Sequence, residues 1–511
     1  LGVLHRTELE FLLVDHLGRF LVHQQLHGLA HLEFAGARTA SAQVLEHALQ
    51  LLRHLLHARR SHDLHAHRYG SHLDLDVALI EKGPLGGVCL NAGCVPSKAL
   101  IEASRLVDRA RKGEPQGIKA TVEVDWPAMQ AWKAGVVGQL TSGVAGLLRN
   151  HKVQVINGAA RFSTPRRIAV ESTEGLQFVD FKDVIIATGV SPAGVAGLTL
   201  DGTSVISAEQ AVSLPALPSS MAIVGADYAG MELAAAFARL GVAVTVIEPG
   251  ARILAEIPAT IGSIVSRGTK ALGVEIRTGV TSVERTEAGL RGESGGEAWT
   301  AAADVVVCSG RGLATLDAVS AGVVGARPGA DGLLAVDNRQ KAAEHVYAAG
   351  DITPGSRLAH RGYAGARIAA EVVAGQRSAF DATVIPLALF TEPEALSAGL
   401  TEADAKTKGI DATTARFPVA ASGRALTLSG DAGFLEVVSE KGSGVVLGIH
   451  GAGPRVTELA GEAALAIEMS ATLDDLALTL HPHPTMSEMI LESAWLGIGA
   501  PLHVFRASHG G

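Results

Sequence analysis

Residues 222–254 read AIVGADYAGMELAAAFARLGVAVTVIEPGARIL, and this stretch decides the fold class. An apolar run ends at Gly225, an alanine-rich segment follows Gly230, and a second apolar run ends at the acidic Glu248. That order predicts a strand, a glycine turn, a helix and a second strand, the βαβ unit of a doubly wound sheet. Free N–H groups at the start of such a helix can face the pyrophosphate of a dinucleotide. Glu248 can accept hydrogen bonds from a ribose 2′-hydroxyl and would repel a 2′-phosphate, which favours NAD over NADP.

The glycine turn departs from the G-x-G-x-x-G pattern at its middle position, where Asp227 replaces a glycine. A carboxylate near a pyrophosphate is repulsive unless it points away. The departure weakens the match of the turn by itself, whereas the acidic strand end at Glu248 supports it. No basic pair follows Glu248 directly, and the nearest base is Arg252.

Length and composition predict a globular protein of several domains. The 511 residues suffice for roughly three domains of about 150 residues each. With 47% hydrophobic and 19% charged residues, the chain can bury ample core. A net charge of −9 argues against nucleic acid or an anionic membrane as the main partner. No apolar run reaches the roughly 18 residues that span a bilayer, and no signal-peptide pattern opens the sequence. We therefore expect a soluble cytoplasmic protein.

The first 74 residues differ in character from the rest of the chain. Twelve of the 20 histidines precede Val77, and no lysine precedes Lys82. Apolar residues at helical spacing over 44–56 predict an amphipathic helix. Three histidines stand close together without a cysteine or carboxylate framework, so we interpret them as a solvated tail rather than a metal site. They are His62, His65 and His67.

The segment DVALIE at 76–81 predicts the second strand of another βαβ unit, ending in an acidic residue, Glu81, that would hold a ribose. The first strand and its glycine-rich turn should lie about 20 to 30 residues upstream. No G-x-G-x-x-G occurs there. Our hypothesis is that residues 1–74 are a wrong-frame or wrong-strand translation that replaces the true N-terminus. Recovery of peptides from this stretch in the native protein by mass spectrometry would contradict it.

Two of the three cysteines, Cys89 and Cys94, lie five positions apart in the segment CLNAGCVPSK. A secreted disulfide scaffold would be rich in cysteine, so this usage points to a catalytic or metal pair in a reducing compartment. In a regular helix five residues rise about 7.5 Å, which exceeds the roughly 4.4–6.8 Å between Cα atoms that a disulfide tolerates. The chain must therefore be distorted here, and Gly93 permits it. If a helix follows, its N-terminal end would favour the thiolate of Cys94.

The segment GGVCLNAGCVPSK at 86–98 resembles the active-site segment of the pyridine nucleotide–disulfide oxidoreductases. The resemblance runs from about Leu75 to Phe505. It implies that Cys89 is the interchange thiol that attacks a substrate disulfide and that Cys94 is the thiol beside a flavin. It also implies that Lys98 sits near the isoalloxazine ring. Glu232 resembles the family glutamate that lies near the nicotinamide and pairs with this lysine.

Two further strand-end turns resemble the flavin-binding set of that family. DVIIATG ends at Gly189, and HVYAAGDI contains Asp351, which resembles the aspartate that holds the ribityl chain of FAD. We interpret His360 as a helix-start residue near the flavin rather than a proton carrier, and Arg252 as part of a structural E-x-x-x-R-I-L pattern. The resemblance implies FAD or NAD contacts at Glu81, Lys98, Ala160, Thr188, Gly189, Gly225, Gly230, Glu232, Glu248, Gly310, Asp351 and Ala359.

The C-terminal segment 481–488 reads HPHPTMSE. Histidine is suited to proton transfer near neutral pH, and a carboxylate can orient it. From the residues alone, a structural histidine beside proline is an equal alternative. The pattern resembles the family members that oxidise dihydrolipoamide, in which the second histidine, here His483, is the acid/base and the glutamate, here Glu488, is its partner. Position 482 is Pro where the family commonly has Ala, and Cys308 is most simply a buried strand residue.

The predicted fold class is α/β, with two doubly wound, Rossmann-like nucleotide-binding domains and a C-terminal α/β dimerisation domain. We expect the FAD-binding domain at 75–192 and 313–384, without its first βα turn. The NAD-binding domain is expected at 193–312 and the interface domain at 385–511. In the family this last domain builds a homodimer, and its histidine reaches the disulfide of the partner.

The resemblance implies NAD-dependent oxidation of dihydrolipoamide, carried on a lipoyl domain of a 2-oxo acid dehydrogenase complex, through FAD and the pair Cys89 and Cys94. One alternative is another FAD-dependent reductase of this family, similar to glutathione or mercuric reductase. The other is a non-catalytic, FAD-deficient remnant. Because the first flavin-binding turn is missing from the sequence, we expect this polypeptide to bind FAD poorly.

Overall fold

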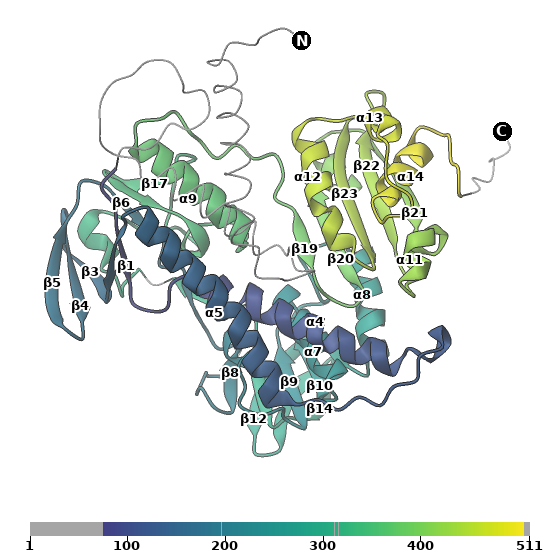
Figure 1. The fold of residues 1–511 in the computed structure, drawn as a ribbon, viewed down its shortest axis with the longest axis horizontal. Helices are drawn as coiled ribbons and strands as arrows, with labels where there is room; N and C mark the ends of the chain where they lie inside the picture. The colour runs from purple at the N-terminus through teal and green to yellow at the C-terminus, as the bar shows by residue number, and fades with distance from the viewer. Residues whose placement is uncertain (1–74, 196, 311, 315, 505–511) are drawn as a thin grey trace, which may run out of the picture. The chain divides into compact units, whose positions relative to one another are not determined.

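The computed structural model describes residues 75–504 with three single-residue gaps, at 196, 311 and 315 (Figure 1). All described residues belong to one structural unit of the chain. The expected helix at 44–56, the histidine cluster and the hypothesis on residues 1–74 lie outside the described residues. Within the described part, no helix combines the length and apolar character that a bilayer crossing requires.

A five-stranded parallel sheet, in the strand order β11-β10-β9-β15-β8, forms the part that the sequence predicts to bind NAD (the NAD half). Both faces of the sheet are covered, so the middle strand β9 carries four consecutive buried residues from Met221 to Val224. Its strands are β8 (Val205–Ser207), β9 (Ser220–Val224), β10 (Ala243–Glu248), β11 (Glu275–Thr278) and β15 (Val305–Cys308). Its helices are α6 (Ala208–Ala211), α7 (Tyr228–Arg239) and α8 (Ala259–Ala271). The succession β9, α7, β10 confirms the βαβ unit that the opening sequence predicts.

The flavin half contains two separate sheet fragments. In one, β1 and β2 pair in parallel; in the other, the order is β17-β18-β6. These strands are β1 (Ala78–Glu81), β2 (Gln154–Asn157), β6 (Val184–Ile186), β17 (Lys341–Ala343) and β18 (Val346–Ala348). The helices of this half are α3 (Gly87–Asn91), α4 (Cys94–Arg111), α5 (Trp126–Asn150) and α9 (Ala359–Val373). A short antiparallel pair, β7 (Val190–Pro192) with β16 (Gly312–Ala314), lies where the chain passes between the halves.

The NAD half provides an internal template for the flavin half. In each half a three-stranded antiparallel meander follows a parallel strand, β11 in the NAD half and β2 in the flavin half. The strand after the meander, β15 or β6, pairs in parallel again. The meanders are β12 (Val280–Thr286), β13 (Gly289–Ser294) and β14 (Glu297–Ala302), and β3 (Ala159–Thr164), β4 (Arg167–Ser172) and β5 (Gly175–Asp180). By this order β1, β2 and β6 correspond to β10, β11 and β15.

The strand that would correspond to β9 is absent from the described part of the flavin half. In the NAD half β9 pairs with β10 on one side and β15 on the other. In the flavin half neither β1 nor β6 pairs with a described strand on the equivalent edge. The described residues therefore form the two sides of a doubly wound sheet without its middle strand, which agrees with the absence of the first glycine turn from the sequence.

The C-terminal part is an antiparallel sheet in the order β19-β20-β23-β22-β21, with helices packed on it (Figure 1). Buried aliphatic side chains such as Leu396, Leu435 and Ile449 form a core of its own. The strands are β19 (Leu387–Leu389), β20 (Glu394–Gly399), β21 (Ala412–Pro418), β22 (Phe434–Glu440) and β23 (Val446–Gly453). The helices are α10 (Glu402–Thr407), α11 (Gly423–Thr427), α12 (Ala460–Glu468), α13 (Leu473–Leu478) and α14 (Glu488–Gly497). The domain boundaries themselves stay predictions, while the α/β fold class is confirmed.

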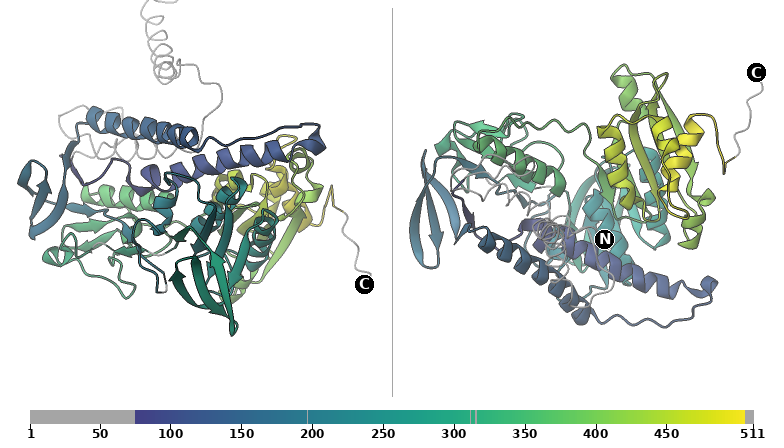
Figure 2. Two further views of the ribbon diagram at one scale, coloured as in Figure 1. Left: turned by 90° about the horizontal axis from the view of Figure 1, so that it is seen from below. Right: turned by 45° about the horizontal axis from the view of Figure 1, so that its top comes forward.

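The described residues also form five short 3-10 helices: η1 (Glu114–Gln116), η2 (Ala321–Val324), η3 (Gly350–Ile352), η4 (Val419–Ala421) and η5 (Val456–Leu459). The long helices α4 and α5 pack on each other and α4 also packs on α7 (Figure 2). Leu100 and Val107 of α4 share one hydrophobic core with Phe237 of α7. This packing places the start of α4, with the cysteine pair, beside the start of α7, with the dinucleotide turn.

Candidate active site

The cysteine pair occupies a break between two helices. Helix α3 ends at Asn91 and α4 begins with Cys94, so the chain leaves helical geometry at the two residues between them. Gly93 has φ −117° and ψ −108°, outside the regular conformations of other residues, and an added Cβ would lie 3.2 Å from the Val88 carbonyl. The Cα atoms of Cys89 and Cys94 come within 4.6 Å and the two thiols form a disulfide. The predicted distortion is therefore present.

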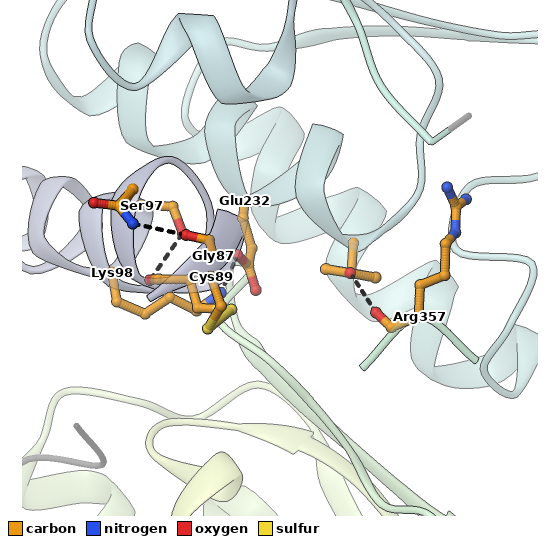
Figure 3. The surroundings of a disulfide bond; sticks show 9 residues. Gly87, Cys89, Ser97, Lys98, Glu232 and Arg357 are labelled. Atoms are coloured by element: carbon orange, nitrogen blue, oxygen red, sulfur yellow. Dashed lines mark hydrogen bonds and ion pairs between the residues drawn. A yellow bond between two sulfur atoms is a disulfide. The ribbon is translucent and has the colours of Figure 1, made fainter. Parts of the chain in front are cut away.

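Lys98, one turn into α4, connects the disulfide segment to α7. Its Nζ lies 2.7 Å from Oε2 of Glu232, whose side chain is only 2% exposed. The other oxygen, Oε1, accepts a hydrogen bond of 2.8 Å from the backbone N–H of Phe390, and the Lys98 ammonium lies 4.9 Å from the centre of the Phe390 ring. Figure 3 shows Cys89 and Lys98 facing Glu232. The structure thus brings the cysteine pair together with both residues of the expected Lys–Glu pair.

The dinucleotide turn has the tight approach that its glycines predict. Gly225 has φ +108°, and an added Cβ would lie 2.4 Å from the Ser309 carbonyl. A Cβ on Gly230 would lie 2.2 Å from the Gly225 carbonyl. Gly310, with φ +97°, faces the same turn from the end of β15. A cavity of about 170 Å³ adjoins the turn and has Glu248 in its wall. These residues fit the ribose and pyrophosphate of a dinucleotide.

Asp227 does not point away from the turn. Its Oδ1 accepts hydrogen bonds from the Gly230 N–H, at 3.0 Å, and from the Ser309 hydroxyl, at 2.7 Å. The carboxylate is thus the N-cap of α7. Burial raises its pKa, while the two hydrogen bonds act in the opposite direction. The carboxylate is accommodated facing inwards, because the helix start and Ser309 supply it with hydrogen-bond donors.

The residues expected at the flavin lie on both fragments of the flavin half. Glu81 ends β1 and accepts a 2.8 Å hydrogen bond from the Gly83 N–H. Glu248, its counterpart in the NAD half, makes the same contact to Gly250 and a second one, at 2.7 Å, to the Ala226 N–H of the glycine turn. No described residue provides that second contact to Glu81, so the described residues fit the sugar of a flavin dinucleotide but supply no cradle for its phosphates.

The remaining flavin candidates stand at the ends of strands or at a helix start. Asp351 lies in η3, and burial raises the pKa of its carboxyl while Arg357 and Arg361 act to lower it. The others occupy β3, the turn after β6 and the first position of α9: Ala160, Thr188, Gly189 and Ala359. Lys98 approaches from α4. The two sheet fragments share one hydrophobic core, in which Ile80 of β1 packs against a cluster that includes Ile186 of β6.

The two histidines of 481–488 have opposite environments. His481 has a side chain only 4% exposed and contacts Glu462, at 2.7 Å from Nε2, and the Thr479 carbonyl, at 2.9 Å from Nδ1. His483 is 80% exposed, and its Nδ1 lies 2.8 Å from Oε1 of Glu488. The second Glu488 oxygen accepts from the Thr485 N–H at 2.8 Å. His483 therefore has an oriented ring with Nε2 free to face solvent or a substrate, whereas His481 is structural.

Neither residue of the His483–Glu488 pair has a hydrogen bond or ion pair with the disulfide segment among the described residues. The structure therefore gives two assembled clusters, the disulfide with Lys98 and Glu232, and the histidine pair on the C-terminal part. Cys308, as expected, is a buried free thiol at the end of β15.

Several contacts were not foreseen in the sequence. The partners of Glu232 and His481, namely Phe390 and Glu462, lie far along the chain, and no local pattern marks them. The same holds for Arg105, whose guanidinium pairs with Glu394 at 2.7 Å and links α4 to the C-terminal sheet. For Asp227 a signal did exist, because Asp before a helix is a common N-cap.

Comparison with protein families matches most of the described chain. Residues 64–366 match the model described as pyridine nucleotide-disulphide oxidoreductase, and residues 385–494 match the dimerisation domain of the same family.

Curated proteins and solved structures extend this similarity. The chain is 41% identical over 441 residues to the dihydrolipoyl dehydrogenase of Halobacterium salinarum, covering 84% of this chain and 93% of that protein. It is 38% identical over 434 residues to the dihydrolipoyl dehydrogenase of Geobacillus stearothermophilus, covering 84% and 92%. The crystal structure of LpdA from Mycobacterium tuberculosis superposes with a TM-score of 0.77 at 25% identity, covering 88% of this chain and 97% of that one.

Proposed function

This chain belongs to the pyridine nucleotide-disulphide oxidoreductase family, and we propose that it catalyses the NAD-dependent oxidation of dihydrolipoamide to lipoamide. One observation carries the proposal. The disulfide of Cys89 and Cys94 is joined through the Lys98–Glu232 ion pair to α7, the helix that opens from the dinucleotide turn. Thiol chemistry and pyridine-nucleotide binding therefore meet at the starts of two packed helices. The dihydrolipoyl dehydrogenases that resemble the chain support the choice of substrate.

The substrate half-reaction follows from the thiols and the histidine pair. The exposed Nε2 of His483, held by Glu488, accepts the proton of one substrate thiol. The resulting thiolate attacks the Cys89 sulfur, the Cys89–Cys94 bond breaks, and Cys94 leaves as a thiolate at the positive end of α4. The second substrate thiol then attacks the substrate sulfur of the mixed disulfide, and Cys89 leaves and takes up the proton of that thiol. Lipoamide leaves with its ring disulfide closed, and the protein keeps two reduced cysteines and two electrons.

The cofactors of the reaction are FAD and NAD. Bound FAD would supply the two-electron transfer from the dithiol to NAD, which would receive the electrons as a hydride. Lys98 and Asp351 are the residues proposed to lie against its ring and its ribityl chain, and Glu81 against its ribose. Glu248 holds the adenosine ribose of NAD and, by its negative charge, disfavours a 2′-phosphate.

The partners and the compartment belong to the same proposal. Among the described residues the histidine pair has no hydrogen bond or ion pair with the disulfide segment of its own chain, and a dimerisation domain matches residues 385–494. We therefore assign His483 to the disulfide of a second copy in a homodimer. Dihydrolipoamide is presented on a lipoyl domain of a 2-oxo acid dehydrogenase complex. A redox-active pair and only three cysteines favour the cytoplasm, a reducing compartment.

A cysteine substitution tests the proposal. Cys89→Ser removes the attacked sulfur, so in assays with excess added FAD lipoamide turnover with NADH should be lost while NADH oxidation by an artificial electron acceptor persists. Cys308→Ser is the matched control, because Cys308 is a buried thiol outside the disulfide, and it should keep both reactions. Lipoamide turnover by the Cys89→Ser protein would disprove the role of Cys89. Turnover of glutathione disulfide instead of lipoamide by the unaltered protein would favour the other reductases of the family.

A further inference from the structure

The N–H groups of the dinucleotide turn are already held by carboxylates of the chain itself. The Ala226 N–H donates to Glu248, at 2.7 Å, and the Tyr228 N–H donates to Glu256, at 3.2 Å. The Gly230 N–H donates to Asp227. Three donors at the start of α7, the positive end of a helix of 12 residues, thus face three negative groups of the protein rather than solvent.

In the wall of the adjoining cavity, the negative charges of these carboxylates outnumber the positive charges. Its wall contains the three carboxylates and a single base, Arg252. The guanidinium of Arg252 is directed to backbone carbonyls, with 2.8 Å to Leu254 and 2.7 Å to Ala255. A pyrophosphate that enters the turn therefore meets like charge at close range, where water screens it least.

Two of the carboxylates have a specific relation to the phosphate position. Glu248 is the ribose ligand of the proposed function, whereas Asp227 and Glu256 occupy N–H groups that a pyrophosphate would use. We propose that Asp227 and Glu256 form an internal anionic plug at the start of α7, which competes with the pyrophosphate of NAD and sets the affinity of the protein for it. The inference rests on the proposed function, of which it specifies the cofactor-binding step.

Glu256 and Asp227 differ in how easily a ligand can displace them from the N–H groups that they accept from. Glu256 is on an exposed loop after β10 and holds one N–H at 3.2 Å, so it can swing out. Asp227 is fixed by Gly230 and Ser309, and its Oδ2 lies so close to Gly310 that a Cβ there would come within 3.1 Å of it. Glu256 is therefore displaced on binding, and Asp227 stays as a negative charge beside the phosphates.

Protonation of Asp227 and Glu256 at acidic pH should weaken their competition with a pyrophosphate. Desolvation at the start of α7 raises the pKa of both carboxyls, and for Glu256 the charge of Asp227 raises the pKa further while Arg252 acts to lower it. Other charged groups act on Asp227 from two elements: Glu232 in α7 raises its pKa, and Arg357, before α9, lowers it. An acid with a raised pKa becomes neutral earlier as the pH falls, and the neutral form no longer repels a phosphate. Binding of a pyrophosphate ligand should therefore tighten as the pH falls.

The test measures binding without turnover on the full-length protein, with ADP-ribose as the pyrophosphate probe and adenosine as the phosphate-free probe in isothermal titration calorimetry. Asp227→Asn and Glu256→Gln remove one negative charge each and keep the shape of the side chain. Each should lower the Kd for ADP-ribose roughly 3- to 10-fold, the range expected for a charge at a helix N-terminus. The Kd for adenosine should not change. Glu287→Gln, an exposed glutamate between β12 and β13 in the same domain, is the control and should match the unaltered protein.

The pH profile completes the test. For the unaltered protein, the affinity for ADP-ribose should rise as the pH falls, and the double variant should show a nearly flat profile over the same range. An unchanged or weaker affinity for ADP-ribose in the Glu256→Gln protein would overturn the inference, as would an equal gain for adenosine. Lipoamide turnover is measured separately. If the variants bind ADP-ribose more tightly but the protein does not turn over lipoamide, only the proposed function is refuted. If the protein turns over lipoamide but the variants bind ADP-ribose no more tightly, only the inference is refuted.

Discussion

At the scale of single residues, the histidines of 481–488 show how a carboxylate can serve two different purposes. Glu462 completes the hydrogen bonding of His481, which is almost fully buried. Glu488 holds only Nδ1 of His483 and leaves the rest of that ring exposed. Because a buried, fully paired imidazole cannot reach a substrate, only the second pair is suited to proton transfer.

Substitution of Glu488 by Gln should therefore reduce lipoamide turnover roughly 100-fold, within the range that positioned acid–base groups contribute. The amide cannot stabilise the positive charge that His483 gains when it accepts the substrate proton. NADH oxidation by an artificial acceptor should be unaffected, because it bypasses the substrate thiols. The measurement is steady-state turnover with both acceptors. Glu462→Gln, which alters the His481 pair in the same way, is the control and should keep lipoamide turnover close to that of the unaltered protein; equal losses in the two variants would contradict the assignment.

At the level of secondary-structure elements, the buried carboxylate of Glu232 stabilises the contact between α4 and α7. Glu232 accepts from the Lys98 ammonium and from the Phe390 N–H, so it joins both helices to the connection between β19 and β20 of the C-terminal sheet. Removing it leaves a cation and a backbone N–H without their partner in a largely buried site.

Glu232→Ala should lower the free energy of unfolding by about 2–3 kcal/mol, since Lys98 is 29% exposed and can recover part of its hydration. Glu102→Ala is the matched control on α4. Glu102 pairs with Arg105 at 2.9 Å but is 57% exposed, so its loss should cost less than about 1 kcal/mol. Urea titration of the two variants measures the difference. Equal losses would show that the Glu232 contacts do not fasten the two helices.

Local patterns predicted the elements that carry the chemistry, and distant contacts limited what they could predict. The cysteine spacing requires a broken helix, and the glycine turn requires β9 and α7 in succession; both are present because they depend on neighbouring residues. Phe390 contacts Glu232 across 158 positions, and Glu256 reaches Tyr228 across 28. Tertiary packing determines such pairs, and no periodicity in the sequence encodes them. The same holds for Ser309, the second partner of Asp227, which directly follows β15 and lies 82 positions along the chain.

At the scale of the whole molecule, the two nucleotide-binding halves are unequal. In the NAD half the middle strand joins both sides of the sheet and leads into the turn that faces the phosphates. In the described flavin half the corresponding place between β1 and β6 has no strand, and Glu81 holds one N–H where Glu248 holds two. A dinucleotide gains much of its affinity from such a turn, because the helix N-terminus and free N–H groups receive its pyrophosphate.

The 511-residue protein should therefore purify with much less than one FAD per chain, although it binds a pyridine nucleotide. The comparison within one molecule controls for misfolding, because the NAD half has its complete sheet. Flavin absorbance after dialysis against FAD gives the stoichiometry, and calorimetric titration of the same sample with NADH shows whether the NAD half is folded. A sample that binds NADH and retains little flavin is the expected result. One tightly held FAD per chain would contradict it, because the phosphates would then have a cradle that the described residues do not contain.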